Sequence, residues 1–356
     1  MQLTHICSIA SGILLSPSAS AMAVDHNTEI YQLTTLADFE PNATTETHDD
    51  AEPESIGWKI LTDIQTVLTM IGMVANIITL ITWICHGKGF PRISRILLQH
   101  QAIIDIIVCL MGSLINIQPR YFWMTGYETI DLLICQVWHG QALYWGCVLL
   151  SVWNLVFVII ERFVMIEYPY KHRNIQPKHT YIAFIIMYFF SVFLLIPAYL
   201  QVRYDREEGK CLYEYYFQTD FYDGFMSDFV IFWFMIVYAI PITIFLVLYT
   251  KIILTLRKRQ QSQVGELYQR SPILETANQQ MTRMVVVVEV VFILCLSWDS
   301  WFYLLGDIGI NYVFNSKYQV IGVFLATFNS VANPFVYSAT MSRFRQNLKK
   351  TLRCGE

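Results

Sequence analysis

An acid and a base stand side by side at the end of a long apolar stretch. Glu161 and Arg162 follow residues 151–160, in which Val, Leu, Ile and Phe would occupy every face of a helix. Such a helix belongs in lipid or deep in a bundle, and an ion pair at its end is expected where membrane meets water. A guanidinium keeps its charge inside a protein and needs an acceptor, for which Glu161 is the natural choice. We therefore expect the function of the protein to depend on Arg162; a structural salt bridge at a helix end is the alternative.

Further polar groups interrupt other apolar stretches. They are Asn76, Asp105, Asn329, Ser330 and Asn333. Polar side chains within a membrane are costly unless they face the bundle interior and find partners, so these residues are functional candidates by default. The sequence contains neither a His-Glu-x-x-His nor a Gly-x-Ser-x-Gly pattern, so we expect no covalent chemistry and no enzyme.

Composition predicts that a membrane positions these groups. Of the 356 residues, 55% are hydrophobic and only 15% are charged, which does not suit a soluble surface. Seven apolar stretches are long enough to cross about 30 Å of hydrocarbon as helices. They cover about 59–85, 95–117, 135–165, 179–201, 226–256, 281–306 and 318–340. We therefore expect an all-α bundle of seven transmembrane helices.

The distribution of basic residues predicts the orientation of this bundle. Lys and Arg gather after the first, third and fifth stretches and in the carboxyl-terminal tail, whereas the alternate loops are acidic or mixed. Because cytoplasmic loops carry the excess of Lys and Arg, we expect an extracellular amino terminus, a cytoplasmic carboxyl terminus and a multi-pass protein of the plasma membrane.

The amino-terminal region has three predicted features. Residues 1–23 resemble a secretory signal peptide, although an uncleaved tail is the alternative. Residues 24–57 are acidic without Lys or Arg and should be disordered. They form either a solvated tail or an electrostatic trap for a cationic ligand. Asn42 begins an Asn-Ala-Thr glycosylation acceptor.

Of the cysteines in the mature chain, Cys135 and Cys211 are the two that fall on the predicted outer side. In an oxidising compartment they can form a disulfide between the third helix and the loop before the fifth. Two unrelated free thiols are the alternative.

Several motifs together resemble the rhodopsin-like (class A) G-protein-coupled receptors. Glu161-Arg162-Phe163, with Pro169 seven residues after the Arg, is similar to their Asp/Glu-Arg-Tyr motif. Asn333-Pro334-Phe335-Val336-Tyr337 matches their Asn-Pro-x-x-Tyr motif. The spacing of Pro241 and Tyr249, and of Phe292 and Cys295, also agrees with the family. These motifs extend over nearly the whole predicted membrane core.

This resemblance implies a switch mechanism. A ligand bound between the outer halves of the helices would favour a state in which the inner end of the sixth helix swings out and Arg162 releases Glu161. Tyr249 and Tyr337 would turn inward, and a heterotrimeric G protein would insert the carboxyl-terminal helix of its α subunit, against which Tyr170 would pack. Arrestin is a further expected partner, and no nucleic acid is expected.

The resemblance also implies an ion site and a membrane-surface helix. Asp105, Ser151, Asn329, Ser330 and Asn333 would surround a small chamber that holds a sodium ion, a hard cation suited to oxygen ligands. A water-filled cluster without sodium is the alternative. Residues 341–351 read as an amphipathic helix on the inner leaflet. Cys354 after it is a candidate for palmitoylation, or else an unmodified thiol.

The sequence departs from the family in three places. Cys295-Leu296-Ser297-Trp298 replaces the Cys-Trp-x-Pro of the sixth helix, so any bend there must arise without proline. Cys135 lies 27 residues before Arg162, more than the family spacing, which predicts a third helix that is tilted or overhangs the membrane. Glu289 has no counterpart in the family.

The expected ligand pocket is aromatic and polar with one carboxylate. Its candidate residues are Gln141, Tyr144, Trp233, Asp299, Ser300, Tyr303 and Gln319. Tyr144 stands where amine receptors place an Asp, and Thr327 stands where opsins carry the Lys that binds retinal, which argues against both ligand classes. Asp299 is the candidate partner of a ligand cation, and an internal pairing is its alternative. With the acidic outer segments it favours a basic peptide ligand, and another small molecule is the alternative.

Two other classes of protein stay open. A secondary transporter also has several membrane helices and buried charges, but it should show internal repeats with broken helices, and the sequence shows no such repeat. An orphan receptor that signals without a ligand would share all the motifs above. Nucleotide exchange measured without an agonist separates a receptor from a transporter.

Overall fold

The computed structural model describes residues 56–117, 125–196, 199, 202–212, 229–262, 272–307 and 317–353. The predicted signal peptide, the glycosylation acceptor Asn42 and the candidate palmitoylation site Cys354 lie outside these residues. Within them, seven helices are long and apolar enough to cross a membrane, which confirms the predicted fold class.

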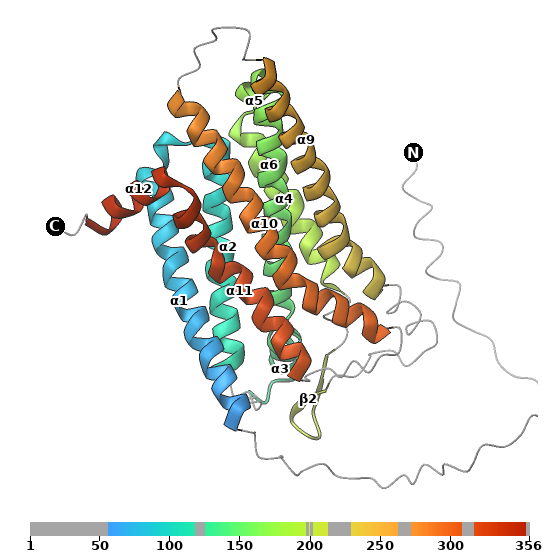
Figure 1. Ribbon diagram of the computed structural model, residues 1–356. Helices are drawn as coiled ribbons and strands as arrows, with labels where there is room; N and C mark the ends of the chain where they lie inside the picture. The colour runs from blue at the N-terminus through green and yellow to red at the C-terminus, as the bar shows by residue number, and fades with distance from the viewer. Residues whose placement is uncertain are drawn as a thin grey trace, which may run out of the picture. The chain divides into compact units, whose positions relative to one another are not determined.

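These helices lie side by side in one bundle (Figure 1). Their bounds are α1 (Ile56–His86), α2 (Arg92–Ile117), α4 (Ala142–Glu167), α6 (Pro177–Leu194), α9 (Ile240–Ser262), α10 (Pro272–Asp307) and α11 (Lys317–Thr340). The short helix α12 (Ser342–Arg353) lies at one end of the bundle, and a β hairpin lies at the other (Figure 1). We call these the α12 end and the hairpin end.

Burial in α1 follows the pattern of a membrane helix, the reverse of that in a soluble protein. Ile64, Ile71 and Val74 are exposed on its surface, whereas Thr69 and Asn76 are buried against the bundle. Polar side chains are stable inside because they find partners there: the Thr69 hydroxyl forms a 2.7 Å hydrogen bond with the Ser113 hydroxyl of α2. The apolar surface is therefore the face that contacts lipid.

The third membrane helix is not continuous, a feature that the sequence did not indicate. It starts as α3 (Glu128–Ile134), widens into a π-helical turn (Cys135–His139), breaks, and resumes as α4. Gln141 at the break has a φ of 53°, in the left-handed region. A π turn accommodates an extra residue within a helix. The wide turn and the break together accommodate the extra residues between Cys135 and Arg162.

A disulfide and a hairpin organise the end of the bundle opposite α12. Strand β1 (Arg203–Asp205) pairs antiparallel with β2 (Lys210–Leu212). The predicted disulfide between Cys135 and Cys211 is present and joins β2 to the π-helical turn. The hairpin is thereby held against the third membrane helix.

Helix α10 bends without proline (Figure 1). The Ser297 hydroxyl donates a hydrogen bond to the backbone carbonyl of Ile293, one turn earlier. Serine bonds of this kind compete with the helical ladder and often bend helices. Ser297 also bonds the Tyr238 hydroxyl at 2.6 Å, which fixes its side chain. A serine of this kind can distort a helix locally where proline is missing.

The predicted amphipathic helix is present as α12. Phe344 is fully buried and packs against the rings of Trp83 and Tyr337, at centroid distances of 5.1 and 5.9 Å. Arg343, Arg345, Lys349 and Lys350 are exposed on its other side. The apolar face thus anchors α12 to α1 and α11, and the basic face is free to meet lipid headgroups.

Close packing of α1 on α11 generates a test. A Cβ added at Gly72 would lie 2.6 Å from Val331 Cγ2 and 3.1 Å from its Cα. We expect Gly72→Ala to lower the free energy of unfolding by about 1–3 kcal/mol through overpacking, measured by thermal unfolding in detergent. Adding Val331→Ala should recover much of the loss. Val74→Ala, on the lipid face of α1, is the control; an equal effect of both variants would contradict this account.

Candidate functional site

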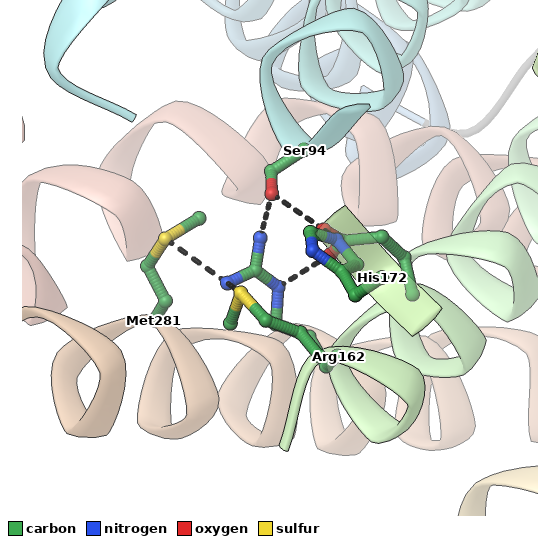
Figure 2. Close-up of polar contacts among 6 residues, drawn as sticks. Ser94, Arg162, His172 and Met281 are labelled. Atoms are coloured by element: carbon green, nitrogen blue, oxygen red, sulfur yellow. Dashed lines mark hydrogen bonds and ion pairs between the residues drawn. The ribbon is translucent and has the colours of Figure 1, made fainter. Parts of the chain in front are cut away.

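Arg162 is enclosed at the α12 end of the bundle (Figure 2). Its side chain is 1% exposed, and its Nε lies 2.8 Å from Oε2 of Glu161. Another guanidinium nitrogen, Nη2, donates to the Ser94 hydroxyl of α2. That hydroxyl in turn donates to Glu161 Oε1 at 2.8 Å. The predicted acid and base are therefore paired, and Ser94 bridges them.

On the side that faces α10, the Arg162 guanidinium contacts a methionine sulfur (Figure 2). Nη1 lies 3.3 Å from the Met281 Sδ of α10 and 3.7 Å from Sδ of Met165. A thioether is a weak acceptor, so this contact is much weaker than the ion pair with Glu161. The end of α10 is also bound to α12, because Gln280 Oε1 accepts hydrogen bonds from the Ser342 backbone N–H at 3.0 Å and its hydroxyl at 2.9 Å.

A third group holds Glu161. His172, on the short helix α5 (Pro169–Asn174), places Nε2 2.7 Å from Glu161 Oε1. Residues of α2, α4 and α5 thus all contact the Glu161 carboxylate. Neither His172 nor Ser94 was predicted from the sequence, because neither belongs to a family motif and only the fold brings them to Glu161.

The other predicted switch residues surround this cluster. Phe163 is half-buried, with the Lys251 amine 5.9 Å from its ring centroid. Tyr170 on α5 is 80% exposed at the α12 end, where a partner protein can reach it. Tyr249 is half-buried on α9, whereas Tyr337 is 1% exposed and follows Pro334 within α11.

Glu289 and Tyr337 line one small cavity. It has a volume of about 10 Å³, and its other lining residues are apolar. Within the part of the chain that the structure describes, Glu289 Oε1 and the Tyr337 hydroxyl are buried without a hydrogen-bond partner. A cavity of this size is at the lower limit for one water molecule. The carboxylate that the sequence left unexplained therefore faces a space lined by α2, α4, α10 and α11.

The predicted polar chamber forms around Asp105. Its Oδ1 accepts hydrogen bonds from Ser330 Oγ at 2.8 Å and, more weakly, from Ser151 Oγ at 3.4 Å. Its Oδ2 accepts from Asn333 Nδ2 at 2.7 Å. Three of the predicted residues thus converge on Asp105, and Asn76 joins them by donating to the Ser330 carbonyl at 3.0 Å.

Two features of the chamber were not expected. Asn329 is buried, but its Oδ1 accepts no hydrogen bond from the described residues. Gln101, one turn before Asp105 on α2, donates from Nε2 to Asp105 Oδ1 at 3.0 Å and to Ser151 Oγ at 2.6 Å. This amide stands between the two oxygens that a sodium ion would share, so the donor set does not fit the predicted ion.

The candidate ligand residues are only partly brought together. Tyr144 is 1% exposed, and its hydroxyl bonds the Val323 carbonyl and the Thr327 hydroxyl, both at 2.9 Å. In this conformation Tyr144 therefore ties α4 to α11. Asp299 on α10 packs against Gly322 of α11, because its Oδ1 is 2.7 Å from where a Cβ at Gly322 would be.

The remaining candidates differ in exposure. Ser300 and Gln319 are buried, whereas Gln141, Trp233 and Tyr303 are half-buried. The Trp233 ring packs on Phe229 of its own helix, with centroids 6.1 Å apart. Gln141 stands at the break before α4, and its side-chain oxygen accepts no hydrogen bond within the described residues.

Comparisons with known proteins agree with this geometry. A family model described as "7 transmembrane receptor (rhodopsin family)" matches residues 75–337. The rhodopsin of Petromyzon marinus is 25% identical over 315 residues, which cover 86% of this chain and 83% of that protein. The rhodopsin of Sargocentron microstoma is 25% identical over 296 residues, with coverage of 81% and 80%. That of Myripristis violacea is 26% identical over 296 residues, with the same coverage.

The cavity beside Glu289 generates a stability prediction. Replacing an unpartnered buried carboxyl by an apolar group of similar size is neutral or stabilising. We expect Glu289→Leu to raise the midpoint of thermal unfolding by about 2–4 °C, and Glu289→Gln, which keeps a polar group, to leave it unchanged. A lower midpoint for Glu289→Leu would show that the carboxyl has a partner, such as a water molecule, that stabilises the fold.

Proposed function

Because the chain belongs to the rhodopsin family of seven-transmembrane receptors, a family of receptors rather than enzymes, we propose that it binds an extracellular ligand and activates heterotrimeric G proteins. The observation that carries this proposal is the enclosed Arg162. It is held by Glu161 on its own helix, by Ser94 on α2 and, through sulfur, by Met281 on α10. This is the arrangement expected of a receptor in its resting state.

Opening of α10 is the step that creates the signalling surface. Glu161 and Arg162 lie on the same helix, so moving α10 away does not leave the guanidinium without an anion. This movement breaks the interaction of Arg162 with the Met281 sulfur and the hydrogen bonds of Gln280 with Ser342. Because these interactions are weak, they suit a two-state equilibrium that a ligand biases by its differential affinity.

The opened cleft would accept the carboxyl-terminal helix of a G-protein α subunit. Arg162 would leave Glu161 and, with Tyr249 and Tyr337 turned inward, line the cleft. Tyr170 already presents its ring at the α12 end and would pack against the partner. Arrestin would compete for the same surface.

Charge and disulfide position support the orientation within the plasma membrane. The exposed Arg343, Arg345, Lys349 and Lys350 of α12 place an excess of basic residues at one end of the bundle. The Cys135–Cys211 disulfide lies at the other end, which suits an oxidising compartment. The amino terminus, with the acceptor Asn42, would then be extracellular, and Cys354 would lie at the cytoplasmic leaflet.

The ligand differs from that of the rhodopsins to which the chain is similar. A retinal Schiff base needs a lysine amine in the middle of α11, whose single lysine is Lys317 at its first position. Thr327 is fully buried and bonds Tyr144. A diffusible ligand therefore replaces the covalent one, and Asp299 with the acidic hairpin residues Glu207 and Glu208 favours a basic peptide.

The first test measures the restraint on Arg162. Glu161→Gln removes the anion while retaining its shape, so we expect nucleotide exchange without ligand to rise by about 3- to 10-fold. His172→Ala should raise it less, because Ser94 still holds Glu161. Arg162→Ala should abolish activation of every G-protein α subunit tested.

Exchange is measured with reconstituted protein and several α subunits, at matched receptor concentration. Ile160→Ala, on the lipid-facing side of the same helix, is the control and should behave as wild type. Unchanged basal exchange in Glu161→Gln, or normal activation by Arg162→Ala, would overturn the proposal.

The second test concerns the ligand. A library of basic peptides is screened against the expressed receptor, with exchange as the readout. For any active peptide we expect Asp299→Asn to lower potency by about 10- to 100-fold, the loss typical of one buried charge-assisted contact, without altering basal exchange. Asp63→Asn, an exposed carboxylate at the start of α1, should have no effect. Equal potency in wild type and Asp299→Asn would exclude Asp299 as the cation partner.

A further inference from the structure

A side-chain amide occupies the place at Asp105 where a cation would bind. A hard cation that used both Asp105 Oδ1 and Ser151 Oγ would lie about 2.3–2.6 Å from each oxygen. Gln101 Nε2 is 3.0 Å from the first and 2.6 Å from the second, and Gln101 is fully buried. The amide hydrogens already satisfy these oxygens, and their positive charge would repel a cation.

The orientation of the Gln101 amide is fixed by its neighbours. Asn154 Nδ2 lies 3.1 Å from the backbone carbonyl of Leu97 and 2.8 Å from Gln101 Oε1. A carbonyl only accepts hydrogen bonds, so Asn154 must direct its NH2 group toward Leu97 and hence toward Gln101. The oxygen of Gln101 then faces Asn154, and its NH2 group faces Asp105.

The same reasoning assigns the direction of the hydrogen bonds toward the lipid-facing side of the bundle. Asn154 Oδ1 can only accept, so the His100 Nδ1 at 2.9 Å must carry the proton. In the neutral imidazole, His100 Nε2, 3.0 Å from the Tyr188 hydroxyl, is then an acceptor. Hydrogen bonds therefore run in one direction from Tyr188 on α6 through α4 and α2 to Asp105. Reversing Gln101 would turn its NH2 group toward that of Asn154 and its oxygen toward Asp105, and would so break the buried hydrogen bonds on both sides of Gln101.

We propose that the Gln101 amide replaces the cation at Asp105, so that this receptor excludes sodium from its central chamber. The carboxylate is then held by neutral donors on α2, α4 and α11, and the conformation of the bundle does not depend on sodium concentration. The inference holds whichever ligand the receptor binds.

The test compares sodium with choline on the purified full-length chain, both as chloride salts at ~0.15 M, which keeps screening equal. We expect the wild type to unfold at the same temperature in both salts. Gln101→Ala leaves room for an ion beside two freed oxygens, so sodium should raise its unfolding midpoint by about 3 °C. Adding Asp105→Asn to Gln101→Ala should abolish that shift.

Binding is also measured directly by the line width of the sodium-23 NMR signal. The proposal is overturned if the wild type broadens this signal, or gains stability from sodium, and Asp105→Asn abolishes the effect. It is equally overturned if Gln101→Ala folds and shows no sodium response, because the amide would then not be what excludes the ion. Should Gln101→Ala fail to fold, the comparison of wild type with Asp105→Asn decides alone.

Discussion

One buried cation governs how this bundle can change shape. Arg162 has almost no exposure and cannot give up its charge, so every conformation must supply it with an acceptor. The structure meets this constraint within a single helix, because Glu161 is the adjacent residue and lies 2.8 Å away. Helix α10 contributes a thioether instead of a carboxylate. The charge is thus balanced within α4, and the contact that α10 makes with Arg162 is a weak one.

The polar interior also distinguishes α10 from the other helices. Asp105, Gln101, Ser151, Asn154 and Asn333 bind α2, α4 and α11 into one network, and His100 and Tyr188 extend it to α6. These buried hydrogen bonds link the helices of the network directly to one another. Helix α10, by contrast, presents to its neighbours an unpartnered Glu289 carboxyl oxygen and an apolar cavity. At its α12 end, α10 contacts the rest of the bundle through Met281 and Gln280, which are uncharged, and this suits a switch.

The sequence predicted the seven helices, the Glu161–Arg162 pair, the disulfide and most of the Asp105 cluster, because long apolar stretches and motifs with fixed spacing are local patterns. Ser94, His172 and Gln101 could not be found in this way, since an isolated Ser, His or Gln acquires its role only from the partner that the fold places beside it. The break at Gln141 was missed for another reason: Gln is not a residue that marks left-handed backbone. The hydrogen bond of Ser297 with the Ile293 carbonyl depends on one side-chain rotation that no spacing reveals.

The central claim is that Glu161 restrains Arg162 and thereby keeps α10 closed. It is tested most directly by the distance between spin labels at Cys85, which is exposed on α1, and at an introduced Gln279→Cys on α10, with Cys354 replaced by Ser. The distribution is compared between this labelled chain and its Glu161→Gln derivative, both without ligand in lipid nanodiscs. The account predicts a second, longer distance that becomes populated when the carboxylate is removed. Identical distributions in the two chains would contradict it.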